Sequence, residues 1–323
     1  MDLIYTDANR VDQGELLAYS FDLSFGAGEN DFSLTFAKSA TRLESKSAVY
    51  VENTEYGGLI DGLKSSTDSG EITYFGRTWH GILNSKVIQP DSGENYLIVS
   101  GNANAILKTL VSRLGLSGLF TVAETDSSVN ISRYQFPRYC KGYDGIRGML
   151  AKNGAKLKIE WNADDRSVRL SAVPIADHTQ SPVDNDTASL SIERHDTKVN
   201  HLICLGRGEL ADREVIHLYA DKSGQIGDVR FYTGVDEVVD IYENTAAEST
   251  EELREGGFSR FAELRNIDKA EMNLTETEAP LYDIGDIVGA EDIETGISLS
   301  ATVTQKIVKI NNGVITTEYK TGS

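Results

Sequence analysis

The chain has 323 residues, of which 40% are hydrophobic and 8% aromatic, with 29 glycines and 5 prolines. This composition is typical of a globular protein, and the length is typical of two or three domains. The chain contains 31 Lys and Arg residues against 50 Asp and Glu residues, a formal charge of −19. That balance excludes a basic groove for nucleic acid or an anionic membrane, because neutralising phosphates requires clustered cations.

The two cysteines and the N-terminus carry no targeting or metal-binding signal. Cys140 and Cys204 lie far apart, so no C-x-x-C zinc or redox motif is predicted, and both are expected to be small buried residues. The first residues lack the basic start and apolar core of a signal peptide, and no stretch approaches the roughly 20 apolar residues of a membrane span. We expect synthesis in a cytoplasm and no membrane insertion.

Short alternating strands separated by turn-forming residues fill residues 1–99. Residues 20–25 and 31–36 place apolar side chains on one face at a period of two, which predicts a hairpin. Further strands are predicted at 48–51, 56–63 and 71–76. Strands at this spacing without intervening helices favour an N-terminal β-barrel-like domain.

The hydrophobic period changes at residue 100. Residues 102–114 form an amphipathic pattern that ends before Gly115, and residues 143–152 predict a second helix. A hairpin is predicted from 156–161 and 167–173, and the polar stretch 177–188 is interpreted as a connector. Residues 100–188 are therefore predicted to form a mixed α/β domain.

Strand patterns return in residues 189–323. Strands are predicted at 200–205 and 214–219, and a hairpin at 301–320 turns at Asn312-Gly313. We expect a helix that begins near Phe258, because Gly256-Gly257 disfavours helix before it. The expected fold class is mainly β with α/β insertions (α+β), and this last region is a second β-barrel-like domain with a helical acidic insertion at about 245–280.

Acidic residues are concentrated near this insertion. From Glu248 to Glu294 there are fourteen acidic and four basic residues. A solvated surface is the favoured interpretation, and a cation or partner site is the alternative. Whether an acidic loop such as Asp283 to Asp286 binds a metal ion stays open.

No catalytic, cofactor-binding or metal-ligating residue is predicted. The G-x-G-x-x-A pattern at 206–211 precedes a strand, whereas a dinucleotide site requires a helix there, so a hairpin turn is favoured. The chain lacks the zincin, nucleophile-elbow and P-loop motifs. Among its five histidines, His80, His178, His195, His201 and His217, only His201 and His217 are expected to approach each other, on adjacent strands, and a metal site there is disfavoured.

The two tryptophans have two interpretations. Trp79 lies among Phe75, Ile82 and Leu83, and Trp161 ends a strand beside a turn. A buried position in a core or a domain interface is favoured for both, and an exposed sugar-binding platform is the alternative. With 50 acidic residues present, a pair of catalytic carboxylates stays open, but no pair ranks above another.

Two regions resemble known phage proteins. Residues 71–101, with Gly76-Arg77, the Gly81-Ile82-Leu83 turn and a closing Ser100-Gly101, resemble the Gp37-like tail proteins of siphoviruses and prophages. Residues 285–322, from Gly285-Asp286-Ile287-Val288-Gly289 to Glu318-Tyr319-Lys320, are similar to the closing hairpin of baseplate-hub and tail-associated proteins.

The resemblance implies a structural, non-enzymatic tail hub in the virion. It implies a homotrimeric ring with pseudo-sixfold symmetry that joins the tail-tube or distal tail protein to a threefold spike, fibre or tape-measure protein. No cofactor is predicted. For a ring on the DNA exit path, the charge of −19 suggests that DNA would pass through an acidic bore without specific binding. The alternative is a carbohydrate-binding or hydrolytic module for the bacterial envelope, which would show exposed tryptophans in a groove with paired carboxylates.

Overall fold

The computed structural model describes residues 2–124, 126–184, 189–276 and 282–322. Strands account for 44% of the structure and helices for 16%, which confirms the mainly β class with helical parts. Every sheet in the described residues is open, so the closure expected of barrel-like domains is not found there. None of the described helices combines the length and the apolar character needed to cross a membrane.

Packing divides the chain into two compact units. Unit 1 comprises residues 1–191 and 270–321, and unit 2 comprises residues 192–269 with 322–323. Unit 2 is thus inserted into unit 1. The chain passes from unit 1 to unit 2 through strand β16 (Ser189–Glu193) and returns through strand β21 (Lys269–Glu276), and these two strands are neighbours in one sheet. The boundaries of the two packing units differ from those of the predicted domains, 1–99, 100–188 and 189–323. The three domains remain a prediction.

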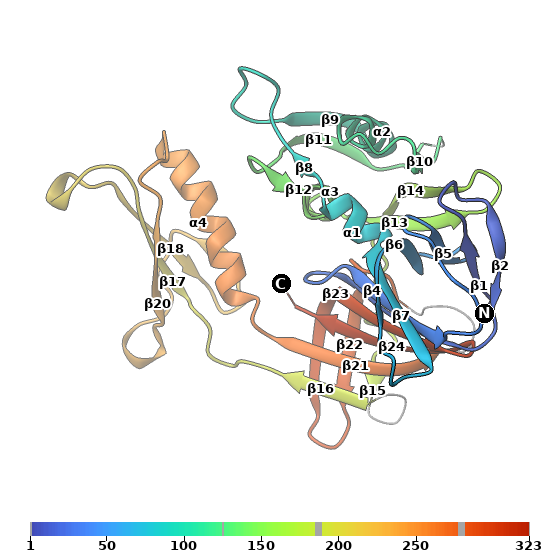
Figure 1. Ribbon diagram of the computed structural model, residues 1–323. Coiled ribbons are helices and arrows are strands. Elements are labelled where there is room, and N and C mark those ends of the chain that lie inside the picture. Colours follow the sequence, from blue (N-terminus) through green and yellow to red (C-terminus); the bar gives the residue numbers. More distant parts are fainter. Residues whose placement is uncertain (1, 125, 185–188, 277–281, 323) are drawn as a thin grey trace. The chain divides into compact units, whose positions relative to one another are not determined.

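Unit 1 is built on a large, mostly antiparallel sheet that joins the two ends of the chain. Strand β23 (Ile297–Asn311) lies between β3 (Tyr19–Gly26) and its own hairpin partner β24 (Val314–Thr321), as the red and blue strands of Figure 1 show. The sheet also contains β16 and β21, and its remaining strands are β1 (Leu3–Thr6), β2 (Asp12–Leu16), β4 (Asp31–Ala37), β5 (Ala48–Val51), β6 (Gly57–Ser65), β7 (Glu71–Thr78), β15 (Val183–Asp184) and β22 (Ile287–Asp292).

The hairpins of this sheet follow the sequence pattern. The predicted pair at 20–25 and 31–36 is β3 and β4, and the Asn312-Gly313 turn has φ values of 50° and 84°. Only small or flexible residues adopt such left-handed angles readily, which is why Asn-Gly closes tight hairpins. Both hairpin predictions are confirmed.

The rest of unit 1 is a mixed α/β layer that shares a core with the N-terminal strands. Trp161 stacks on both Tyr50 and Trp79, with ring centroids 4.5 and 5.2 Å apart, so side chains before and after residue 100 pack in one cluster. Asn102 caps the N-terminus of helix α2, and Gly115 follows its end at φ 70°. The elements are α1 (Trp79–Asn84), β8 (Val87–Ile88), β9 (Ile98–Asn102), α2 (Ala103–Arg113), β10 (Phe120–Val122), β11 (Asn130–Gln135), β12 (Cys140–Lys141), α3 (Gly142–Ala151), β13 (Ala155–Asn162) and β14 (Ser167–Pro174).

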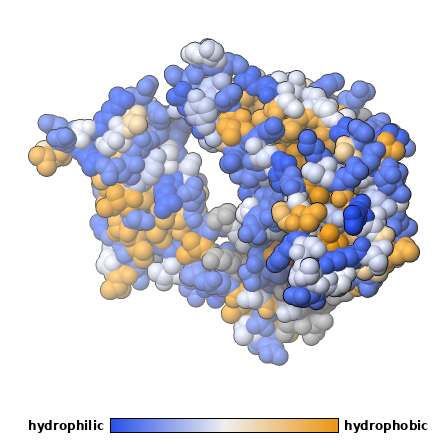
Figure 2. Space-filling view, viewed as in Figure 1, coloured by the Kyte–Doolittle hydropathy of each residue, from blue (hydrophilic) through white to orange (hydrophobic). Residues whose placement is uncertain are grey.

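Unit 2 is a small sheet covered on one face by helix α4 (Thr250–Arg265). Its strands are β17 (His201–Leu205), β18 (Val215–Ala220), β19 (Ile226–Gly227) and β20 (Val239–Glu243), with 3₁₀ turns at Leu210–Asp212 and Gly234–Asp236. The face opposite the helix exposes apolar side chains (Figure 2), including Val215, Val239 and Ile241 at 45%, 47% and 59%.

The predicted start of helix α4 near Phe258 is wrong. The helix begins at Thr250, where the Ser249 side chain accepts a hydrogen bond from the Glu252 backbone N–H. A Cβ on Gly257 would stand 2.6 Å from Cys204 Sγ, so this glycine permits close packing of the helix on the sheet. Tertiary packing therefore outweighs the low helix propensity of glycine here.

Candidate functional site

The most charged interior region lies in unit 1 and is here called the ionic cluster, comprising Glu55, His80, Lys156, Asp283, Asp286 and Lys306. Its residues come from the β5–β6 turn, helix α1, strand β13, the segment before β22, and strand β23. The cluster therefore joins chain segments more than 200 residues apart.

Lys306 lies at the centre of the cluster and is fully buried. Its Nζ donates to Glu55 Oε1 at 2.6 Å and stands 5.9 and 5.7 Å from the ring centroids of Phe25 and Tyr319. Burial alone would raise the pKa of Glu55, but the charge of Lys306 and the hydrogen bond from His80 lower that pKa to about 2. Glu55 is therefore a carboxylate, and it supplies the charge that keeps the ammonium group in the interior.

Lys156 neutralises the acidic loop. Its Nζ donates to Asp283 Oδ2 at 2.7 Å and to both carboxylate oxygens of Asp286 at 2.7 and 2.8 Å. Burial would lower the pKa of Lys156, but these hydrogen bonds and charges raise it overall. Asp286 also accepts the backbone N–H groups of Ala176 and Asp283. A lysine thus occupies the position a metal ion would need, and no group of three metal-ligating side chains is found in the described part of the chain.

A cavity of about 240 Å³ adjoins the cluster and is lined in part by Glu55, His80 and Asp283. His80 is 2% exposed, places Nε2 3.3 Å from Glu55 Oε2, and stacks on Phe25 with ring centroids 4.6 Å apart. The lining carries the hydroxyls of Thr54 and Tyr56, and that of Thr54 donates to the Val51 carbonyl at 2.8 Å. The imidazole is thus paired with a carboxylate and the Thr54 hydroxyl with the backbone, which favours a structural cross-link over covalent catalysis.

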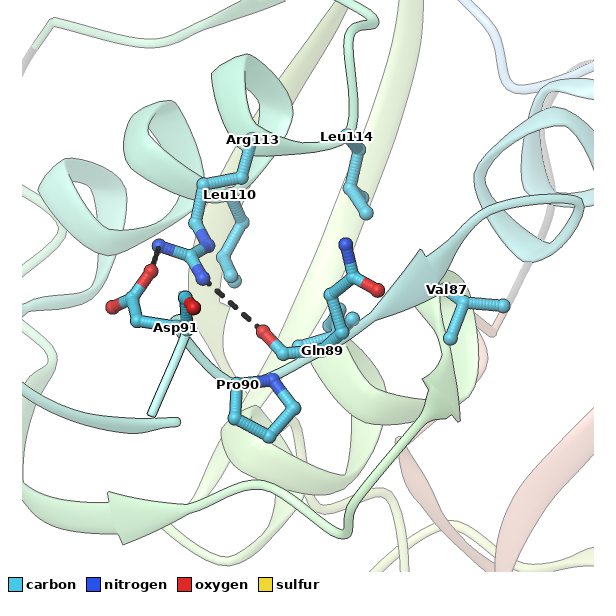
Figure 3. Close-up of a pocket in the computed structure, with 9 residues that line it drawn as sticks. Val87, Gln89, Pro90, Asp91, Leu110, Arg113 and Leu114 are labelled. Atoms are coloured by element: carbon cyan, nitrogen blue, oxygen red, sulfur yellow. Dashed lines mark hydrogen bonds and ion pairs between the residues drawn. The ribbon is translucent and has the colours of Figure 1, made fainter. Parts of the chain in front are cut away.

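A second recess lies between helix α2 and the segment after β8. It has a volume of about 270 Å³ and is lined by Val87, Gln89, Pro90, Asp91, Leu110, Arg113 and Leu114, among others (Figure 3). Arg113 donates to the Gln89 carbonyl at 3.1 Å and pairs with Asp91 at 2.8 Å. The Arg113 guanidinium therefore links helix α2 to the segment after β8.

The predicted approach of His201 and His217 is confirmed. His201 Nε2 lies 2.8 Å from His217 Nδ1, and His201 Nδ1 lies 2.9 Å from Glu237 Oε1. Burial lowers the pKa of His201, and the Glu237 hydrogen bond offsets part of that effect. One of these two facing ring nitrogens donates a hydrogen bond to the other, so each already has a hydrogen-bond partner.

The buried positions favoured for the tryptophans are also confirmed. Trp79 and Trp161 are 0% and 1% exposed, so neither forms a sugar-binding platform. Cys204 is buried as expected, but Cys140 is half-buried, which corrects its prediction, and both thiols are free. The 206–211 segment is the turn between β17 and β18, as predicted. The remaining histidines, His178 and His195, lie beside Asp286 and Glu193.

Solved structures identify the fold. A 43 kDa tail protein of prophage MuSo2 from Shewanella oneidensis aligns with a TM-score of 0.61 at 14% identity, covering 99% of this chain and 98% of that one. A tail protein from Neisseria meningitidis aligns at 0.59 and 14% identity, covering 100% and 96%. The chain has the fold of prophage tail proteins.

The prophage tail protein gp18 from Listeria monocytogenes shares this tail-protein fold, with a TM-score of 0.53 at 12% identity over 99% of this chain and 94% of that one. No protein-family model and no curated protein matches the sequence. The tail-protein part of the resemblance is therefore confirmed at the level of fold, and membership of the Gp37-like family stays a prediction.

Proposed function

We propose that the chain is a structural hub of a phage or prophage tail, working as a homotrimeric ring between the sixfold tail tube or distal tail ring and a threefold tail tip. The observation that carries this proposal is the alignment over essentially the full length of the prophage tail protein from Shewanella oneidensis and of the tail protein from Neisseria meningitidis. The aligned residues include both units.

The role we propose is non-enzymatic. Its support is the site chemistry: the buried imidazole of His80 is paired with Glu55, and the acidic loop is neutralised by Lys156. The burial of both tryptophans disfavours the carbohydrate-binding alternative, which would require exposed tryptophans. Partners of the ring would be a tail-tube or distal tail protein on one side and a spike, fibre or tape-measure protein on the other.

The charge of −19 suits a ring that passes DNA without holding it. Acidic walls repel phosphates within roughly a Debye length, about 8 Å at physiological salt. We expect no retention of duplex DNA in filter binding at low salt. Tight binding under those conditions would contradict this part of the proposal.

Negative-stain micrographs of the purified protein, alone and mixed with the distal tail protein of the same virus, test the ring itself. We expect closed threefold rings in at least the mixture. Compact single particles in both samples, together with cleavage or retention of bacterial envelope polysaccharide, would favour the alternative module instead.

A further inference from the structure

A pocket in unit 2 concentrates positive charge in an otherwise acidic unit. Residues 192–269 contain ten Lys and Arg against seventeen Asp and Glu, a formal charge of −7. The pocket, of about 450 Å³, is lined by four cations, Arg194, Lys198, Lys222 and Arg265, and by three aspartates. We call it the cationic pocket. Its cations come from the segment after β16, the turn after β18 and the last turn of α4.

Two of these cations are already neutralised. Lys198 Nζ pairs with Asp268 Oδ2 at 2.5 Å, and Arg194 pairs with Asp196 at 3.0 Å. Within the described residues, no carboxylate lies within 4.0 Å of Lys222 or Arg265, although Asp236 also lines the pocket. The pocket thus keeps two cations without an ion-pair partner.

Both cations without a carboxylate partner belong to one turn or lie against it. Lys222 is part of the turn after β18, and its Nζ stands 5.7 Å from the ring centroid of Phe231. Arg265 Nη1 donates to the Val199 carbonyl at 2.7 Å, which fixes the guanidinium. Its Nη2 stands 3.3 Å from the position that a Cβ on Gly224 would take, so it lies against the turn that carries Lys222. Asp221 Oδ1 stiffens that turn by accepting the backbone N–H groups of Ser223 and Gln225 at 2.8 and 3.0 Å.

We propose that the cationic pocket binds a phosphate group on a small molecule or polymer, with Arg265 and Lys222 as its ligands. Arginine and lysine are the usual phosphate ligands, the former through its fork of N–H donors and the latter as a point charge. A phosphate monoester carries a charge of about −1.5 to −2 at pH 7. Two unpaired cations match that charge better than they match the single charge of a carboxylate ligand. The volume exceeds that of phosphate alone, so it leaves room for a carrier such as a sugar or glycerol. The proposal concerns unit 2 alone and does not depend on ring assembly.

Calorimetric titration of the full chain at low salt tests the proposal, with inorganic phosphate, glycerol phosphate and dimethyl phosphate as separate probes. We expect saturable binding of at least one probe. Tighter binding of glycerol phosphate would assign a monoester source, and tighter binding of dimethyl phosphate a diester source such as a polymer backbone. Absence of saturable binding for all three at tens of millimolar would overturn the proposal.

Two variants of equal charge change locate the binding. Lys222→Gln is expected to weaken phosphate binding about tenfold, roughly the loss of one charge-assisted contact. Arg260→Gln, on the same helix α4 but paired with Glu263 outside the pocket, is expected to leave affinity within about twofold. Equal weakening by both variants would show a diffuse effect of net charge and would contradict a built site. Circular dichroism of each variant confirms folding.

Discussion

Lys306 is a fully buried ammonium whose nearest carboxylate, Glu55, lies 251 positions away in the sequence. A buried ion pair contributes little net stability compared with a hydrophobic pair, but removing one partner leaves an uncompensated charge. The sequence pattern placed Lys306 on a strand and gave no sign of its partner. Long-range pairs of this kind cannot be predicted from local periodicity, because the pairing depends on how β23 aligns with β3.

Lys306→Met is expected to lower the free energy of unfolding by about 3–5 kcal/mol, since Glu55, whose side chain is only 14% exposed, then loses its lysine partner. Lys309→Met, an exposed position on the same strand, is the matched control and should change stability by less than about 0.5 kcal/mol. Urea unfolding measures both. Similar losses in the two variants would contradict the ionic cluster, and Glu55→Gln combined with Lys306→Met should recover part of the loss.

Acid sensitivity is a second consequence of Glu55. Its pKa is lowered from 4.5 to about 2 in the folded protein, so its contribution is full above pH 4.5 and is lost as the pH falls toward 2. The difference corresponds to about 3 kcal/mol. We expect the free energy of unfolding to fall less steeply between pH 4.5 and 2 in Glu55→Gln than in the wild type. Glu44→Gln, at an exposed position, should keep the wild-type slope, and an unchanged slope in both variants would count against this assignment.

At the scale of elements, Gly257 shows where sequence reasoning fails. Glycine normally weakens a helix, yet here a side chain would meet Cys204 Sγ at 2.6 Å and Leu218 Cδ1 at 3.0 Å. Propensity predicted the wrong helix start because it does not include the distance between helix and sheet. The strands and hairpins, in contrast, follow from alternation and turn residues such as Asn312-Gly313, whose local signals decide the structure.

Gly257→Ala therefore tests packing against propensity. Overpacking is expected to lower the free energy of unfolding by about 1–3 kcal/mol. Ser259→Ala, exposed on the same helix, should raise it by a few tenths of a kcal/mol through propensity alone. Thermal or urea unfolding measures both. Stabilisation by Gly257→Ala would mean that α4 does not pack closely on β17 and β18.

At the scale of the molecule, the chain has two packing units with separate cores. Phe261 is fully buried in the core of unit 2, and Phe120 is 2% exposed in unit 1. Replacing a buried phenylalanine by alanine costs about 3–5 kcal/mol. Hydrogen exchange of Phe261→Ala should show lost protection within 201–265 and retained protection within 19–37, and Phe120→Ala should show loss in unit 1. Equal loss in both units from either variant would contradict their independence.

The sequence predicted the β class and the tail-protein resemblance, but it did not predict the two units. The insertion of residues 192–269 into unit 1 is set by the pairing of β16 with β21 and of β3 with β23. These pairings join segments that are remote in the sequence. The predicted connector at 177–188 lies close to the first crossing, but no sequence signal shows that the chain returns to unit 1 after residue 269. The candidate site was missed for the same reason, since Glu55, Lys156 and Lys306 are each an ordinary charged residue until the fold brings them together.

The most direct measurement of the proposed hub is the mass of the purified protein by light scattering across a range of concentrations, alone and with the distal tail protein of its virus. The proposal predicts a trimer of about 106 kDa, three times the chain mass of 35.3 kDa, either alone or once the partner is added. A stable dimer at every concentration, or a monomer that the partner leaves unchanged, would contradict it.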